Sequence, residues 1–121
     1  MSAGLVAGTG AALCDVLIAV LHGTDEPAYA SHALRLALAS TALGETVGLY
    51  LAVHGTTLLA ADAPEGLRAT LEEARELGLK VYACPTSLAE HELSPPAGIF
   101  EPLGAAAALE VMRQAHTVIT F

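Results

Sequence analysis

Residues 15–27 read DVLIAVLHGTDEP, a continuous apolar run followed by a polar turn and a proline. An unbroken run of Val, Leu and Ile is typical of a strand that is buried on both faces of a parallel sheet. The polar turn offers an N-cap, and Pro27 fits the first turn of a helix. Ala and Leu then continue to about Leu43, and Gly44 provides a helix stop. This segment therefore predicts a buried strand followed directly by a helix.

The same alternation of apolar bursts and helical patterns continues to the end of the chain. Further strands are predicted at residues 46–53, 80–83, 99–100 and 116–121, and further helices at residues 64–77, 85–92 and 104–114. Because helices between buried strands make right-handed crossovers, the pattern predicts an α/β fold with a parallel sheet covered on both sides. We expect one domain over residues 15–121, preceded by a flexible leader over residues 1–14 that is rich in Gly, Ala and Thr.

Composition narrows the class of protein further. The chain has 121 residues, the length of one domain, and its 54% of hydrophobic residues excludes intrinsic disorder. Five Lys and Arg against thirteen Asp and Glu leave a net charge of −8. Affinity for nucleic acid depends on basic side chains that displace counterions, so nucleic acid is excluded as a partner.

The apolar N-terminus is neither a secretory signal nor a membrane span by its sequence. No Lys or Arg precedes Arg35, whereas a secretory signal requires a cationic start. Asp15 interrupts the apolar run, and a span would place its carboxylate in the bilayer at a cost of ~3 kcal/mol. We therefore expect a cytoplasmic protein with no membrane partner. The two cysteines, Cys14 and Cys84, are too few for a disulfide framework.

Three residues capable of chemistry follow predicted strands, namely His22, His54 and Cys84. Ligands and reactive groups in open parallel sheets gather at the carboxyl ends of the strands, so these side chains are expected near one another. Pro85 favours a helix start that makes Cys84 the N-cap, where free backbone N–H groups and the helix dipole stabilise a thiolate. The alternative is that Cys84 is a small buried apolar residue, and Cys14 is interpreted in that way.

The histidines allow several interpretations. His22 and His54 are either hydrogen-bonded loop residues or groups that supply positive charge or a proton to Cys84. Together with Cys84 they could also form a zinc site with one open position, although no tight ligand spacing supports it. The remaining three histidines are interpreted as structural or surface residues: His32, His91 and His116.

Phosphate-binding motifs are absent from the sequence. The Gly8-Thr-Gly10 segment lacks the third glycine of a dinucleotide fingerprint and precedes a strand instead of a helix. No Gly-Lys-Ser/Thr exists for a P-loop, and the carboxylates of residues 23–27 would repel the phosphate of a flavin mononucleotide. We therefore predict no cofactor and no resident metal.

Several segments together resemble the DsrE/DsrF-like family of small sulfur-relay proteins. They are Gly23-Thr-Asp-Glu-Pro27, Ala33-Leu-Arg-Leu-Ala-Leu-Ala39, Gly78-Leu-Lys-Val-Tyr-Ala-Cys84 with Ser87-Leu88, and His116-Thr-Val-Ile-Thr-Phe121. The resemblance implies a three-layer α/β/α sandwich around a five-stranded parallel sheet, flavodoxin-like in general architecture. It also implies a persulfide on the cysteine after the third main strand, which is Cys84.

The resemblance also bears on partners and assembly. It implies a sulfur carrier or sulfurtransferase that exchanges sulfur with donor and acceptor proteins or small sulfur compounds. Thr86 or Ser87 would then donate hydrogen bonds to the terminal sulfur from the first turn of the helix. It further implies a homo-oligomer, a trimer or hexamer.

Two features of the residues themselves support further expectations. Between Pro27 and Gly44 only Arg35 is formally charged, so apolar residues surround most of the helix and predict contacts between subunits through the first or last helix. The alternative to sulfur transfer is a non-catalytic subunit or small-ligand-binding module. Its pocket would be lined by apolar residues such as Leu58, Leu59 and Phe100.

Overall fold

The computed structural model describes residues 14–121 of the chain. The predicted leader therefore lies outside the described residues except for Cys14. Ten elements follow one another along the chain: β1 (Val16–Val20), α1 (Pro27–Ala42), β2 (Val47–Leu51), the 3-10 helix η1 (Val53–Leu59), α2 (Glu65–Glu76), β3 (Lys80–Ala83), α3 (Pro85–Glu90), β4 (Glu101–Pro102), α4 (Ala105–Gln114) and β5 (Thr117–Thr120).

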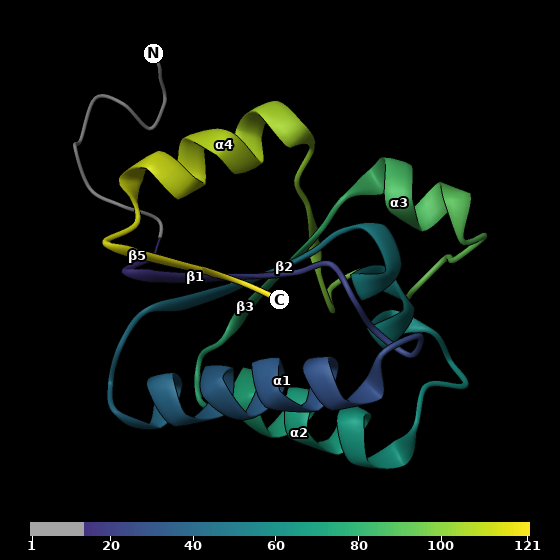
Figure 1. Ribbon diagram of the computed structural model, residues 1–121, viewed down its shortest axis with the longest axis horizontal. Coiled ribbons are helices and arrows are strands. Elements are labelled where there is room, and N and C mark those ends of the chain that lie inside the picture. The colour runs from purple at the N-terminus through teal and green to yellow at the C-terminus, as the bar shows by residue number, and fades with distance from the viewer. Residues whose placement is uncertain (1–13) are drawn as a thin grey trace.

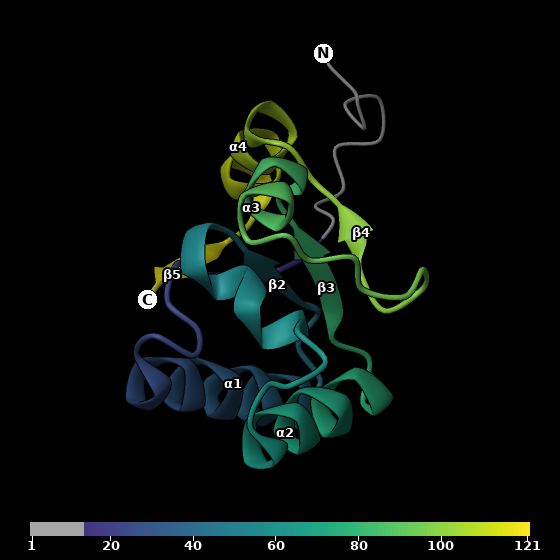
Figure 2. The same cartoon turned by 90° about the vertical axis from the view of Figure 1, so that its right-hand side faces the viewer.

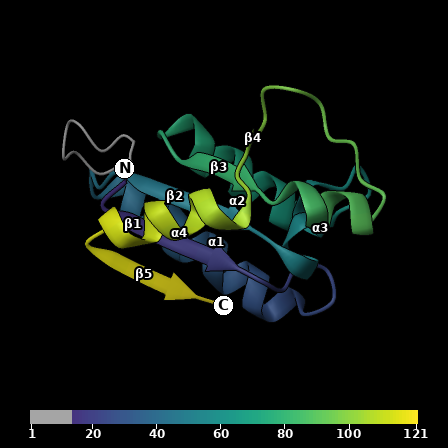
Figure 3. The same cartoon turned by 90° about the horizontal axis from the view of Figure 1, so that it is seen from above.

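The five strands form one parallel sheet in the order β4-β3-β2-β1-β5. The chain moves from β1 outward to β4 and then crosses to the opposite edge with β5, so β1 lies inside the sheet, as its apolar sequence predicts. Figure 1 shows α1 and α2 on one face and α4 on the other, and Figure 3 shows α4 crossing above the strands. The predicted α/β sandwich with a five-stranded parallel sheet is confirmed.

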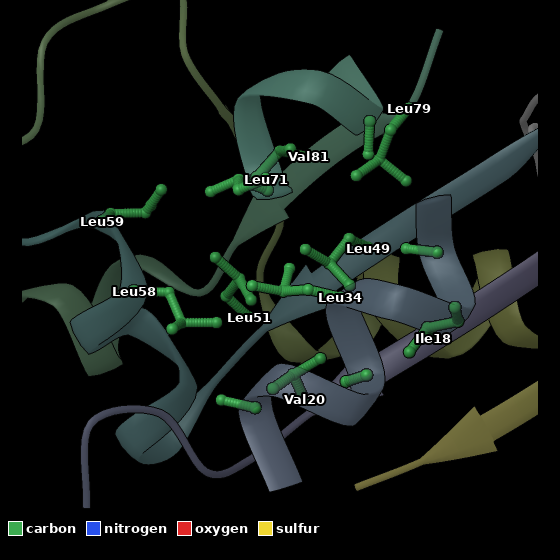
Figure 4. Packing of buried hydrophobic residues seen from close by; sticks show 14 of the residues in the cluster. Ile18, Val20, Leu34, Leu49, Leu51, Leu58, Leu59, Leu71, Leu79 and Val81 are labelled. Carbon is green, nitrogen blue, oxygen red and sulfur yellow. The ribbon is translucent and has the colours of Figure 1, made fainter. Parts of the chain in front are cut away.

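Two hydrophobic clusters hold these layers together. The larger cluster lies between the sheet and the helices α1 and α2, and Figure 4 shows Leu34 packed among Ile18, Leu49 and Leu51. The smaller cluster lies on the other face, where Ala108 and Val111 of α4 pack against the strands. Cys14 belongs to this smaller cluster, with 1% of its surface exposed. Among the described residues, no helix is long and apolar enough to cross a membrane.

Three predicted elements have bounds that differ from the structure by two residues. The helix predicted over residues 85–92 ends at Glu90. The fourth strand is Glu101–Pro102 instead of residues 99–100, because β3 pairs Tyr82 with Glu101 and Ala83 with Pro102. Ile99 and Phe100 pack against the larger cluster instead.

The second strand ends at Leu51, two residues before the predicted end at Val53. Val53 begins η1 with a φ of 55°. This backbone conformation cannot continue a strand.

The loops that follow β1 and β2 are locked together at the carboxyl edge of the sheet. The N–H of Ala52 donates to the Val20 carbonyl at 3.1 Å, and the N–H of His54 donates to the Leu21 carbonyl at 3.1 Å. Gly55 lies so close that a Cβ there would overlap the carbonyl oxygen of Val20. This contact requires glycine and fixes the position of η1 relative to β1.

Candidate functional site

Cys84 lies at the carboxyl edge of the sheet, directly after β3. Its N–H donates to the Leu51 carbonyl at 2.9 Å, which continues the β2–β3 pairing by one residue. Its own carbonyl accepts from the N–H of Leu88 at 3.0 Å and so begins α3. Cys84 is the N-cap residue of this helix, with Pro85 in the first turn, and its side chain is half-buried. Figure 2 shows α3 beyond the ends of β2 and β3.

The surroundings of Cys84 favour its thiolate. Burial raises the pKa of the thiol, but the N–H and the hydroxyl of Ser87, the N–H of Thr86 and the hydroxyl of Tyr50 outweigh burial and lower the pKa overall. Among the described residues of α3, no backbone N–H donates a capping hydrogen bond to the neutral side chain of Cys84. These donors act on the thiolate, because a charged acceptor attracts N–H and O–H groups more strongly than a neutral thiol does.

Ser87 is oriented by the loop after β2. Its Oγ accepts a hydrogen bond from the N–H of Val53 at 2.8 Å, and its side chain is buried. Because that bond uses a lone pair of the oxygen, the Ser87 hydroxyl hydrogen stays free to donate to Cys84. Thr86 is exposed and contributes its backbone N–H. Of the two residues predicted to support the helix N-terminus, Ser87 therefore contributes its side chain and Thr86 its backbone.

Sequence reasoning missed Tyr50. This residue lies in β2 opposite Tyr82, so it is on the same face of the sheet as Tyr82 and Cys84. Burial raises the pKa of Tyr50, and the neighbouring charge of a Cys84 thiolate raises it further. The phenol therefore stays protonated and able to donate. Tyr50 is identified by the register between β2 and β3, together with the alternation of side chains between the two faces of a strand.

Replacing Ser87 by alanine should raise the pKa of Cys84, because it removes a hydrogen-bond donor from the thiolate. A hydrogen bond to a charged group contributes roughly 1.5–3 kcal/mol, so alkylation of Cys84 below neutral pH should slow by about tenfold. The measurement is the rate of iodoacetamide labelling of Cys84 against pH, and its midpoint should move upward. Thr86→Ala is the matched control, because it keeps the backbone N–H. An equal shift in both variants would contradict this role of the Ser87 hydroxyl.

The structure places His22 and His54 in two different pairs. The Nδ1 of His22 lies 3.0 Å from Oδ2 of Asp25, and its ring packs on Tyr29. The Nδ1 of His54 lies 3.0 Å from Nε2 of His91. In the part of the chain that the structure describes, no group of three or more His, Cys, Asp or Glu side chains is arranged to hold a metal ion. The structure therefore does not bring together His22, His54 and Cys84 as a zinc site.

The interpretation of His91 as a merely structural or surface residue missed its contact with His54. The other two interpretations agree with what the structure shows. The ring of His32 packs edge-on against Phe121, with ring centroids 5.7 Å apart. His116 is exposed, and its N–H donates to the Asp15 carbonyl at 2.9 Å.

A separate cavity of about 520 Å³ lies between η1, α2 and residues 92–99. Leu58 and Leu59 line it, as the sequence suggests, and Ile99 lines it in place of Phe100. Arg68 and Arg75 add positive charge to its wall. Cys84 is not among its lining residues, so the cavity and the cysteine are distinct features.

The fold is that of a small α/β protein, and its candidate site is a cysteine at the carboxyl edge of the parallel sheet whose surroundings stabilise the thiolate. The chain belongs to the DsrE/DsrF-like family, whose model matches residues 15–121. The fold is similar to that of the YchN protein of E. coli, with a TM-score of 0.79 and 18% identity over 89% of this chain and 99% of that one.

A conserved protein of unknown function, BT1422 from Bacteroides thetaiotaomicron, is also similar in fold. Its TM-score is 0.67, with 15% identity over 88% of this chain and 95% of that one. No curated protein sequence matches the chain at a significant level.

Proposed function

We propose that this protein carries sulfane sulfur as a persulfide on Cys84. The observation that carries the proposal is the set of donors around Cys84, which lowers the pKa of its thiol at a half-exposed helix N-terminus. A thiolate is the nucleophile in sulfur exchange, and a thiol of low pKa also leaves more readily. Membership of a family of sulfur-relay proteins supports the same chemistry.

The chemistry of loading is a simple exchange. The Cys84 thiolate attacks the outer sulfur of a donor persulfide, a new S–S bond forms at Cys84, and the S–S bond of the donor breaks. The donor leaves as a thiolate, so there is no net oxidation and no further reactant is needed. Donor and acceptor are thiol-bearing proteins or small sulfur compounds.

The direct test is to treat the purified protein with a sulfane-sulfur donor and determine its intact mass. We expect a gain of one sulfur atom per chain, which peptide mapping assigns to Cys84. A wild-type protein that gains no sulfur would contradict the proposal.

The cavity favours a second candidate function, the binding of a small molecule. Its volume of about 520 Å³ lies within the usual range for ligand sites, and its wall combines leucines with Arg68 and Arg75. Native mass spectrometry of protein isolated from cells separates the two functions. A retained small molecule on a chain with an unmodified thiol would favour binding over sulfur transfer.

We also propose that the chain assembles into a homo-oligomer, a trimer or hexamer, through α1 or α4. Large apolar side chains are exposed on both helices or directly beside them: Tyr29 is 56% exposed, Leu43 is 84% exposed and Leu109 is 49% exposed. Closed symmetry is a common way to bury such surfaces.

Light scattering should give a trimeric or hexameric multiple of the 12.3 kDa chain. Aspartate at Leu36 or Leu38 would also disturb folding, because both pack against the larger cluster. Ala39→Asp in α1 and Leu109→Asp in α4 avoid this problem, because both side chains are exposed. Dissociation by one of the two substitutions identifies the contact helix, and a wild-type monomer at micromolar concentration would contradict the assembly.

A further inference from the structure

A chain of hydrogen bonds fixes the protons on two imidazole rings beside the cysteine site. The Nδ1 of His91 lies 3.1 Å from the carbonyl oxygen of Ser87. A carbonyl oxygen only accepts, so Nδ1 of His91 carries the hydrogen, and the Nε2 of a neutral His91 is a bare lone pair. That lone pair lies 3.0 Å from Nδ1 of His54, which must therefore donate. A neutral His54 is left with its own Nε2 unprotonated.

This unprotonated nitrogen belongs to an exposed residue of η1, the 3-10 helix that follows the strand next to β3. His54 is exposed and follows β2, whereas His22 follows β1, which lies one strand further from β3. Cys84 continues the pairing of Ala83 with Leu51, so it lies beside Ala52, two residues before His54. His91 is the C-cap residue of the same short helix whose N-cap is Cys84. The hydrogen bond between the two histidines therefore holds His54 at the far end of α3 from the thiol.

We propose that His54 is the general base that removes the proton from the thiol of the sulfur acceptor, and that His91 is a positioning residue that fixes the tautomer of His54. The proposal rests on the function proposed above. In this step the acceptor S–H bond breaks, its proton moves to Nε2 of His54, and the resulting thiolate attacks the outer sulfur on Cys84. A new S–S bond forms on the acceptor, the S–S bond at Cys84 breaks, and Cys84 leaves as a thiolate.

The placement of His54 away from the Cys84 sulfur is what this step requires. The persulfide bond adds about 2 Å to Cys84, and an attacking sulfur approaches to about 3–3.5 Å beyond it. A base that takes the proton of the attacking thiol stands about one hydrogen bond further out, ~3 Å. The six residues of α3 span about 9 Å, a similar length. A base at the far end of α3 therefore serves the acceptor, not Cys84.

The charged and titratable groups around His54 are compatible with this role. His91 faces it from α3. Asp25 lies in the loop after β1. Burial raises the pKa of its carboxyl group, but hydrogen bonds from His22 and Gly23 lower it, and the pKa is lowered overall. A positive charge on His54 is close enough to lower this pKa further. A carboxylate at this position stabilises the imidazolium that forms when His54 takes the proton.

The test compares two acceptors of sulfur from the loaded protein in single-turnover reactions. An aliphatic thiol must lose a proton before it attacks, whereas a water-soluble phosphine attacks with its lone pair and forms a phosphine sulfide without losing one. We expect His54→Asn to slow transfer to the thiol by about 100-fold and to leave transfer to the phosphine unchanged. An aryl thiol that is already ionised should also be insensitive to the substitution.

His91 is tested by two variants. His91→Ala should slow transfer to the aliphatic thiol by about tenfold, near the upper end of the range for a lost hydrogen bond between neutral groups. His91→Gln should restore most of the rate, because its side-chain oxygen can accept from Nδ1 of His54. His116→Asn is the matched control on an exposed histidine away from the site, and it should transfer sulfur at the wild-type rate.

Several results would overturn the proposal. Equal slowing with thiol and phosphine would show a structural role for His54, and no slowing would show no role at all. Imidazole ¹⁵N chemical shifts give a readout that is independent of activity, and a proton on Nε2 of neutral His54 would also overturn it. If the wild-type protein cannot be loaded with sulfur, the proposed function itself fails and this role fails with it. Normal loading with unaltered transfer in His54→Asn overturns only the role of the base.

Discussion

Replacing Cys84 by serine should abolish the uptake of sulfane sulfur completely, whereas Cys14→Ala should retain a full gain of one sulfur atom per chain. The two cysteines lie in opposite environments. Cys84 is half-buried among donors that lower the pKa of its thiol. Cys14 is 1% exposed, and burial raises the pKa of its thiol above the ordinary value, with the charge of Asp15 acting in the same direction. Of the two thiols, Cys84 is therefore the more accessible and the more readily ionised.

Intact mass after treatment with the donor measures this difference directly. The experiment includes a chemical denaturation curve for each variant, so that a loss of uptake in Cys84→Ser is not a loss of folding. Sulfur uptake that survives Cys84→Ser and disappears in Cys14→Ala would reverse the assignment. Uptake that survives in both variants would place the sulfur on another group.

The second large effect is expected at Gly55. An alanine there would place its Cβ into the Val20 carbonyl, whose carbon atom would lie 2.8 Å away, and both groups belong to the backbone. β1 is paired on both sides, with β2 and β5, and η1 is hydrogen-bonded to the end of β1 and the residue after it, so neither can move away without breaking these bonds. We expect Gly55→Ala to lower the free energy of unfolding by about 3 kcal/mol or more. Denaturation in urea measures this loss.

Gly66 provides the matched control for Gly55. It lies in α2, and a Cβ built there meets no atom within 4 Å. Gly66→Ala should therefore raise the free energy of unfolding by about 0.5 kcal/mol, because alanine loses less conformational freedom in a helix than glycine does. Equal stability of Gly55→Ala and Gly66→Ala would contradict the close contact between η1 and the end of β1.

Most of the fold follows from patterns within single segments. The apolar run of β1 and the glycine that ends α1 are local signals, and they predict a strand buried inside the sheet and the helix that follows it. The edge strand β4 is different, because its two exposed residues become a strand only through their pairing with Tyr82 and Ala83. Local sequence cannot predict pairing that is created by the partner strand.

In the candidate site too, some residues can be predicted from local sequence and others only from tertiary contacts. Pro85 marks the helix start and so identifies Cys84 as its N-cap residue from neighbouring residues alone. Tyr50 joins the site through the register between β2 and β3. His91 meets His54 across 37 positions of sequence, through a contact between a helix end and a loop. Both depend on tertiary placement, which a single sequence does not reveal.

The contact between Gly55 and the Val20 carbonyl has a consequence for how sulfur would be delivered. A carrier that moves its bound sulfur between partners needs a flexible hinge. Here η1 is held against the end of β1 by the contact of Gly55 with Val20, and the N–H of Val53, whose φ is 55°, donates to Ser87. Sulfur on Cys84 would be presented on a fixed platform. The reach must then come from the other molecule, so an acceptor with its thiol on a flexible tail should collect sulfur faster than one with a recessed thiol.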